Sequence, residues 1–314
     1  IFDREAQVKI IGNFGELGLG RSSILASDAG SYGIGGGFNT FGTGWGDVGS
    51  QSLLWGAGFS SRYDNMLTYV TPEFAGFKVY AQYSFGDGSG DENKSTSNRY
   101  YGIGATYTNG GLNLLAVVDS INKKSNPTIK VGGESQSIAE LTGINVDVKD
   151  TVRAVVGGSY DFGVVKPYLA VGYFKDGSIT DMGGLYDEDF DIGVGEMNSG
   201  DVMSYMYFDG FAVALGADAP LFGGTIHGMV GYLDADSDRT VLGSNSDILP
   251  VLDKIDFTRW MVGVGYDYNL SKRTVVYVDA GYMKDSWEIK GLGDAGLDID
   301  PTMFQAALGM VHYF

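Results

Sequence analysis

The sequence predicts an all-β fold, a transmembrane antiparallel β-barrel, on three observations. Its 314 residues include 50 Gly and 20 Tyr but only 6 Pro, a composition that suits many short strands and turns. Apolar and polar residues alternate along most of the chain, as they do on strands whose two faces meet different surroundings. Aromatic residues stand at the ends of the apolar faces, where membrane interfaces collect Trp and Tyr. We therefore expect a single barrel domain over residues 1–314.

Alternation is clearest in residues 258–282. Trp260 and Val264 share one face of the first strand, whereas Arg259 and Asp267 share the other, because successive side chains of a strand point in opposite directions. An apolar face that ends in aromatic rings is typical of a strand in lipid. The aromatic residues that we expect to face lipid are Trp260, Tyr266, Tyr268 and Tyr282.

Thirteen strands can be followed along the chain. They are expected at residues 5–12, 16–21, 62–71, 77–85, 98–108, 111–120, 151–162, 164–175, 203–218, 222–235, 256–269, 272–286 and 301–314. Short turns, such as Asn109–Gly111 and Ala219–Pro220, alternate with long connections, such as residues 121–150. Short turns at one rim and long loops at the other are the pattern of outer-membrane barrels.

The apolar runs are too short for a helical membrane protein. Two of the longest, Leu112–Val118 and Phe211–Ala217, fall far below the ~20 residues that a spanning helix needs. Residues 22–60 interrupt the strands with a long Gly- and Ser-rich stretch. A loop of this length inside a compact domain is usually functional when it is ordered.

The charge balance excludes several classes of protein. With 39 acidic and 21 basic residues, the formal charge of −18 argues against binding to nucleic acid and favours cations as binding partners. The absence of Cys excludes disulfides and thiolate catalysis, and nothing in the sequence indicates a cofactor. The start, Ile1–Arg4, has neither a basic nor an apolar leader segment, which indicates a mature, trimmed or incomplete chain.

Three candidate sites have ordinary explanations. Gly33–Gly37 is rich in glycine, but no Lys-Ser or Lys-Thr pair follows it as in a phosphate-binding loop. Asp187, Asp189 and Asp191 are weak candidates for divalent ions, because a closing Glu is missing and a solvated acidic loop explains them as well. The two His residues, His227 and His312, stand in no recognisable catalytic motif, so we expect no enzyme.

Four segments carry a resemblance to a known family. They are Asn13–Gly15 with Leu19–Arg21, Tyr69–Phe77, Gly263–Thr274 and Gly309–Phe314. Together they resemble the Gram-negative general porins, most closely the betaproteobacterial type. The resemblance implies a trimeric outer-membrane barrel of sixteen strands, whose third loop folds inward as a constriction. It also implies a water-filled channel for the passive diffusion of ions and small hydrophilic solutes.

The chain departs from the family pattern at its start. Residues 4–12 correspond to the fourth strand of the family, so we expect three further strands upstream of Ile1. Arg4 aligns with a channel-facing arginine, yet strict alternation from it would put Val8 inside and Glu5 and Lys9 outside. A bulge or a buried subunit interface would reconcile the two patterns.

The resemblance assigns roles to single residues. It makes residues 22–60 the inward-folded loop, whose only acids, Asp28 and Asp47, would face Arg4 and Arg62, with Arg21 nearby. Such a neck would carry a transverse field that sorts solutes by charge. From the neck and the acidic outer loops we expect a weak cation preference that fades or reverses as salt rises.

The resemblance also implies partners. His312 and Phe314 match the C-terminal pattern of the family, which the outer-membrane insertion machinery reads. Lipid and lipopolysaccharide would surround the barrel. Two alternatives stay open: an outer-membrane channel that prefers one substrate, and a secreted adhesive or structural β-protein.

Overall fold

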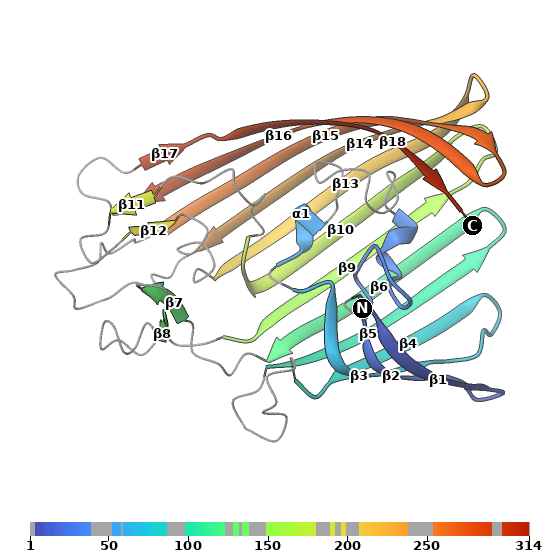
Figure 1. Cartoon of the computed structure of the whole chain (residues 1–314), viewed down its shortest axis with the longest axis horizontal. Coiled ribbons are helices and arrows are strands. Elements are labelled where there is room, and N and C mark those ends of the chain that lie inside the picture. Colours follow the sequence, from blue (N-terminus) through green and yellow to red (C-terminus); the bar gives the residue numbers. More distant parts are fainter. Residues whose placement is uncertain are drawn as a thin grey trace.

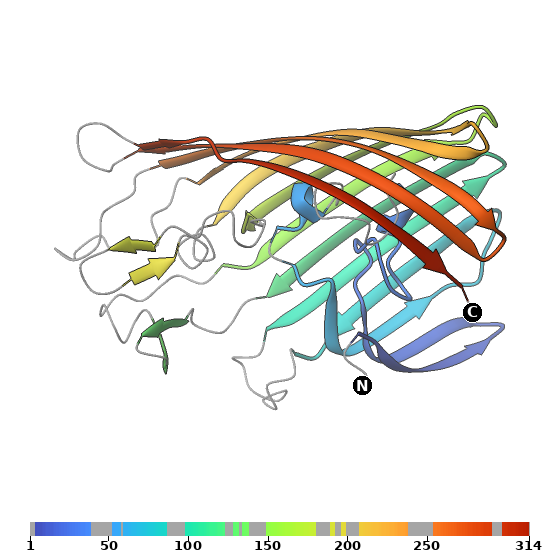
Figure 2. The ribbon, with the colours of Figure 1, turned by 45° about the horizontal axis from the view of Figure 1, so that its top comes forward.

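The computed structural model describes residues 4–38, 52–57, 59–86, 98–122, 128–131, 134–137, 149–179, 189–191, 196–198, 207–237, 254–290 and 297–313. Its main element is one 14-stranded antiparallel sheet that curves around a hollow (Figures 1 and 2). The strands of this sheet are β1 (Ala6–Gly12), β2 (Gly15–Ser23), β3 (Arg62–Val70), β4 (Phe77–Ser84), β5 (Arg99–Asn109), β6 (Leu112–Asn122), β9 (Thr151–Tyr160), β10 (Lys166–Gly177), β13 (Phe208–Leu221), β14 (Gly224–Ser237), β15 (Lys254–Ser271), β16 (Thr274–Lys290), β17 (Leu297–Ile299) and β18 (Thr302–His312).

Six shorter elements complete the description. Two small hairpins, β7 (Thr128–Val131) with β8 (Glu134–Ser137) and β11 (Asp189–Asp191) with β12 (Glu196–Asn198), lie in the long connections. A 3-10 turn, η1 (Gly35–Phe38), and a one-turn helix, α1 (Ser52–Trp55), lie between β2 and β3. Neither of these described helices is long or apolar enough to cross a membrane.

The prediction of thirteen strands is confirmed. β17 and β18 pair one after the other with β16, so the 14 strands occupy thirteen positions in the sheet. Within the described residues, β1 and β18 form the two edges of the sheet and do not pair with each other. Because all neighbours are antiparallel and thirteen is odd, β1 and β18 run in the same direction.

One predicted turn is misplaced. Strand β13 continues through Ala219 and Pro220, and the chain turns at Phe222–Gly223. These two residues have φ angles of 47° and 82°, and two successive positive φ angles suit the twist of a tight hairpin. Pro220 therefore marks the neighbourhood of the turn rather than its position.

The two rims of the sheet differ as the sequence predicts. The tight turns gather at the right-hand rim of Figure 1, and the long connections leave the opposite rim. This asymmetry is characteristic of outer-membrane barrels, whose short turns face the periplasm. We call the two rims the turn rim and the loop rim.

The outer face of the sheet is an apolar band between two aromatic belts. Exposed aliphatic residues of the band include Val79, Ile103, Val118, Val156, Leu169, Leu215, Val230, Val262, Val264, Val278 and Leu308. Exposed aromatic residues toward the turn rim include Phe14, Phe74, Phe77, Tyr160, Phe162, Phe222, Tyr268 and Tyr313, and those toward the loop rim include Phe85, Tyr101, Tyr173, Phe211, Trp260, Tyr282 and Phe304. A water-facing sheet would not expose this much apolar surface, whereas a sheet in lipid requires it.

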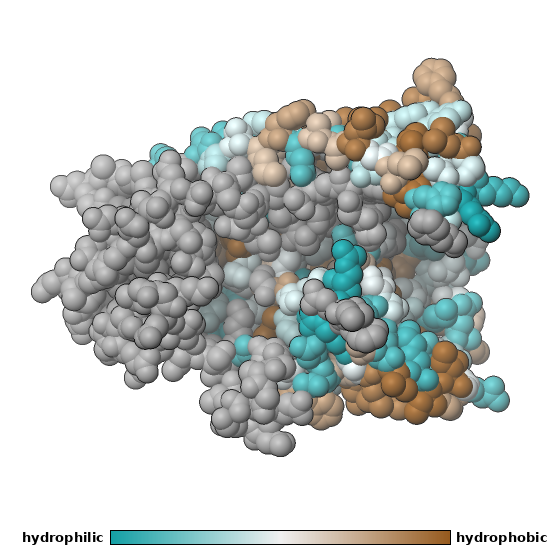
Figure 3. Space-filling model, in the orientation of Figure 1, coloured by the Kyte–Doolittle hydropathy of each residue, from teal (hydrophilic) through white to brown (hydrophobic). Residues whose placement is uncertain are grey.

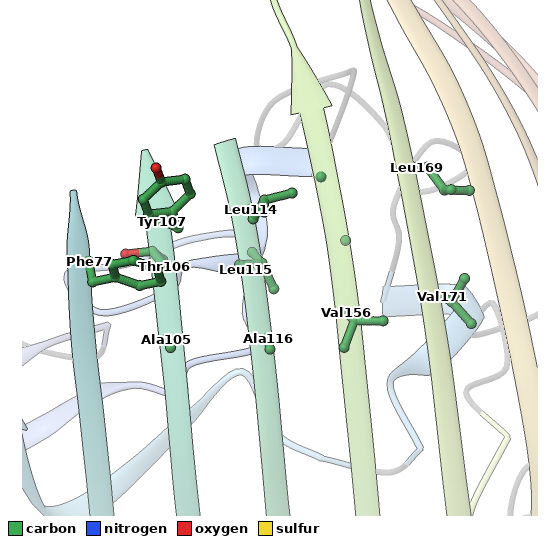
Figure 4. Close-up of a pocket in the computed structure, with 12 residues that line it drawn as sticks. Phe77, Ala105, Thr106, Tyr107, Leu114, Leu115, Ala116, Val156, Leu169 and Val171 are labelled. Carbon is green, nitrogen blue, oxygen red and sulfur yellow. The ribbon is translucent and has the colours of Figure 1, made fainter. Parts of the chain in front are cut away.

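The space-filling view agrees with this arrangement. Hydrophobic residues gather at the upper and lower margins of the sheet toward the turn rim, and hydrophilic residues are visible between these margins (Figure 3). The outer band also holds a shallow groove of about 560 Å³ across β5, β6 and β9 (Figure 4). Small residues, Ala105, Ala116 and Gly158, leave the groove open between larger ones such as Leu114 and Leu169.

The alternation of β1 is opposite to the one derived from a channel-facing Arg4. Gln7 donates a hydrogen bond of 2.8 Å to Ser31 inside the hollow, and the ammonium of Lys9 lies 4.3 Å from the ring centre of Tyr32. Val8, on the other face, is 68% exposed. Glu5, Gln7 and Lys9 therefore face inward, and neither a bulge in β1 nor a subunit interface is needed.

The inner face contains an apolar core that the sequence reasoning missed. Toward the loop rim, β10 and β13–β16 turn fully or almost fully buried side chains inward, namely Phe174, Phe208, Ala212, Leu233, Phe257, Met261 and Trp287. Both faces of these strands are thus apolar in their loop-rim halves.

Candidate channel lining

Two described parts of residues 22–60 lie inside the curve of the sheet. The first, residues 22–38, ends in η1, and the second, residues 52–57, contains α1 (Figures 1 and 2). We call them the inner loop. Helix α1 packs against β10, β13 and β14, across the hollow from β3, to which it is joined.

Glycines in the wall make room for the inner loop. A Cβ atom added at Gly172 of β10 would lie 2.8 Å from Cβ of Trp55, and one added at Gly231 of β14 would lie 2.8 Å from a methyl carbon of Leu54. A side chain at Gly172 would force the backbone of α1 to move, and one at Gly231 would force the side chain of Leu54 to move. The absence of side chains at these two wall positions therefore lets α1 lie directly on the sheet.

A carboxylate clamps the first part of the inner loop. Glu5 accepts hydrogen bonds from the backbone N–H of Ser23 and of Ser31, both at 3.0 Å, and from Oγ of Ser31 at 2.6 Å. Burial raises the pKa of the Glu5 carboxyl, but the hydrogen bonds from Ser31 and Ser23 outweigh burial and leave its pKa below the ordinary value. Tyr32 adds a second attachment by donating to Glu16 at 2.7 Å.

An ion pair in the wall holds the second part. Arg153 of β9 donates through Nε to Asp119 of β6 at 2.9 Å, and both side chains are almost completely buried. Nη1 of Arg153 also donates to the carbonyl oxygens of Trp55 and Gly56, at 3.1 and 3.2 Å. The hydroxyl of Tyr100 donates to Asp119 at 3.1 Å. Sequence reasoning missed this network, because residues from four distant segments meet in it.

The predicted arginines have different surroundings. Arg4 is exposed and precedes β1 by two residues. Arg21 pairs with Asp64 of β3 at 2.9 Å, an acid that sequence reasoning did not single out. Arg62 begins β3 and donates to Oγ of Ser61 at 3.2 Å.

The predicted acids are only partly described. Asp28 lies partly exposed in the inner loop. Asp47 and Asp187 fall outside the described residues, and Asp189 and Asp191 are described only as the backbone of β11. No constriction of Asp28 and Asp47 against arginines can therefore be drawn from the described part of the chain.

The aromatic and C-terminal candidates lie along the last strands. Trp260, Tyr268 and Tyr282 are 56, 42 and 45% exposed on the outer face. Tyr266 is partly exposed and donates from its hydroxyl to the carbonyl oxygen of Leu221 at 2.9 Å. Nδ1 of His312 lies 2.9 Å from Oγ1 of Thr274, and Phe314 falls outside the described residues.

The Gram-negative porin family matches residues 2–286 of this chain. The chain belongs to the Gram-negative porins. An outer membrane porin protein of Bordetella pertussis is 30% identical to it over 294 residues, which are 91% of this chain and 67% of the relative. Outer membrane porin protein 32 of Delftia acidovorans is 26% identical over 324 residues, covering all of this chain and 74% of the relative.

Solved structures of outer-membrane proteins share the fold of this porin. An anion-selective porin from Comamonas acidovorans matches with a TM-score of 0.53 and 24% identity over 100% of this chain and 78% of that one. OmpT, an outer membrane protein of Vibrio cholerae, matches with a TM-score of 0.63 and 16% identity over 99% of this chain and 80% of that one. Family and fold together identify an outer-membrane channel for passive diffusion. The alternative of a secreted adhesive protein is wrong.

Proposed function

We propose that this porin passes ions and small hydrophilic solutes through a neck formed by its inner loop, without a chemical step. The observation that carries the proposal is the double attachment of the inner loop to the inner wall, through Glu5 and through Arg153. A loop held at two places narrows the channel permanently, because it occupies part of the hollow. Charges on that loop then act at short range on every passing ion.

Thiol labelling tests this role of the inner loop, because the chain contains no Cys. The variant Asp28→Cys, reconstituted in planar bilayers, should lose single-channel conductance when a positively charged methanethiosulfonate is added. The matched control is Val264→Cys on the outer face, which should not respond. Unchanged conductance of the fully labelled Asp28 variant would mean that residue 28 lies outside the ion path.

We further propose that the functional unit is a homotrimer in lipid and lipopolysaccharide. One matching solved structure is described as the trimer form of OmpT, with a TM-score of 0.61. The aromatic belts of the outer face suit the two membrane interfaces. Heat-modifiable migration on gels, with cross-linking to three copies, would support the trimer, and a single copy throughout would contradict it.

We also assign assembly to the C-terminal residues. His312 and Phe314 would present the terminal signal that the insertion machinery reads. Deleting Phe314 should lower the amount of folded porin in outer membranes, whereas His312→Gln should retain the aromatic end and most of that amount. Equal amounts of folded porin for the deletion and the wild type would refute the signal.

The ionic preference of this chain is a separate proposal. The matching Comamonas acidovorans structure is described as anion-selective. This chain has a formal charge of −18, and we propose a weak cation preference in dilute salt that fades or reverses as salt screens the outer charges. Arg62→Ala should shift the reversal potential further toward cations, and a potential insensitive to both salt and this substitution would contradict the proposal.

A further inference from the structure

Polar side chains cluster on the inner wall near the turn rim. Asp218 of β13, His227 of β14, Asp267 of β15 and Asp279 of β16 come from four adjacent strands. Alternation places them on the same face as the buried core residues, for example His227 on the face of Met229. Tyr168 of β10 extends the cluster by donating from its hydroxyl to Asp218.

The imidazole of His227 lies between two carboxylates. Its Nδ1 is 2.9 Å from Oδ1 of Asp218, and its Nε2 is 3.3 Å from Oδ2 of Asp267. The carboxylate of Asp218 can only accept a hydrogen bond, so Nδ1 carries the proton in that contact, whereas the contact of Nε2 with Asp267 is a charge contact rather than a hydrogen bond. When both ring nitrogens are protonated, His227 neutralises one of the negative charges in the cluster.

Asp279 has an oxygen that nothing in the described structure satisfies. The residue is only 9% exposed, and its Oδ2 is buried without a hydrogen-bond partner among the described residues. Gly265 of β15 lies opposite both His227 and Asp279 in the sheet register, so no β15 side chain stands between them. A buried, unsatisfied carboxylate oxygen is costly, and a bound donor would relieve that cost.

The cluster keeps an excess of negative charge. Three carboxylates face one imidazole, so the formal charge of the cluster is about −2 even when His227 is protonated. Two other charges lie near Tyr168: Lys166, opposite Asp218, whose ammonium is 4.9 Å from the ring centre of Tyr168, and Asp161 in the β9–β10 turn. Among the described residues, no three His, Asp or Glu side chains are placed to hold a metal ion.

We propose that this cluster is a binding station for small ammonium-type cations at the turn-rim end of the channel. The proposal rests on the proposed function and names a preferred class of solute. A primary ammonium group has three N–H donors on one nitrogen, so it can donate hydrogen bonds to Asp267 and Asp279 together. It does not need the fixed ligand geometry that a metal ion requires. The side chains of Asp218 and Asp267 are 19 and 24% exposed, so the lumen gives access to the station.

Current through reconstituted channels with methylammonium chloride as the probe tests the station. In the wild type, the methylammonium current should saturate as its concentration rises, because each cation binds in the channel and the occupancy of that site saturates. Asp279→Asn and Asp267→Asn should each raise the half-saturating concentration by about fourfold, the effect in water of one unit charge about 5 Å away. His227→Gln should lower it, because that change removes the neutralising positive charge.

The control is Asp256→Asn, which lies in β15 with Asp267 but on the opposite face. It removes the same charge and should leave the half-saturating concentration unchanged. The opposite signs expected for the His227 and the Asp variants separate a binding station from general damage to the fold. Equal half-saturating concentrations in the wild type and all variants, with normal potassium conductance, would overturn the station alone. Absence of conductance in the wild type would instead overturn the proposed channel function.

Discussion

Replacing Arg153 by Met should both destabilise the barrel and loosen the inner loop. The substitution keeps most of the side-chain volume but leaves the Asp119 carboxylate buried without its cation, since both partners are at most 3% exposed. Breaking a buried ion pair from one side costs about 3–5 kcal/mol. The carbonyl oxygens of Trp55 and Gly56 lose their donor at the same time.

Two measurements separate these effects. Urea unfolding in lipid vesicles, followed by tryptophan fluorescence, gives the free energy of unfolding, and single-channel recording gives the steadiness of the open current. Arg153→Met should lower the free energy of unfolding by about 3–5 kcal/mol and add fluctuations to the open current. The double variant Asp119→Leu with Arg153→Met should regain part of the stability, because a buried pair replaced by apolar groups is often neutral, whereas the buried hydroxyl of Tyr100 loses its acceptor Asp119. It should keep the fluctuations, because the donor to α1 is still absent.

Arg259→Met is the matched control. Arg259 pairs with Asp285 through Nε and Nη2 at 2.7 and 2.6 Å, with both side chains at most 1% exposed. Arg259→Met leaves the hydrogen bonds from Arg153 to Trp55 and Gly56 in place, so it should lose similar stability with a steady current. A loss below about 1 kcal/mol for Arg153→Met, a value usual for exposed pairs, would refute the reasoning. So would a current as steady as that of Arg259→Met.

Three further predictions concern the wall and the first loop attachment. Val264→Arg should cost about 2–4 kcal/mol in the same unfolding assay if position 264 lies near the membrane midplane, and an unchanged free energy would contradict a lipid-facing surface. Gly172→Val should push Trp55 away from the wall and raise current fluctuations, whereas Gly163→Ala, at the exposed β9–β10 turn, should not. Because the pKa of Glu5 is lowered in the folded porin, its hydrogen bonds stabilise the loop above the ordinary Glu range of about 4 and are lost as pH falls through the lower folded value. Acid pH should therefore change the conductance of the wild type, and Glu5→Gln should show that change at neutral pH; a pH-independent wild type would exclude the clamp.

The sequence predicts the strands well because a strand in lipid must alternate along its whole length. Val262 and Val264 face outward, and the alternation of apolar residues with polar or small ones around them in the sequence is enough to predict this. The interior is harder to predict, because its contacts join distant segments. Arg153 meets Trp55 only after the inner loop crosses the hollow, and Asp218 meets His227 through strand register. Neither contact can be recognised from the residues that adjoin its partners in the sequence.

The resemblance to the family locates the inner loop but not the residues that hold it. Alignment with the family selects Arg4 and Arg21, and Arg21 is paired with Asp64. An alternation counted from Arg4 instead puts the clamp residue Glu5 on the outside. One wrong starting residue inverts a whole strand, because the side-chain period is two.

The odd number of strand positions among the described residues limits how this sheet can be resized. Deleting or duplicating a β-hairpin changes the count by two, so β1 and β18 still run in the same direction. A wholly antiparallel ring requires these edges to be joined through an odd number of added strands, one or three, since each strand reverses the direction. The diameter of a barrel grows with its strand number, so such grafts would set the bore in steps of two strands. A wider or narrower pore built from this sheet should therefore be designed by choosing the number of strands added between the edges β1 and β18.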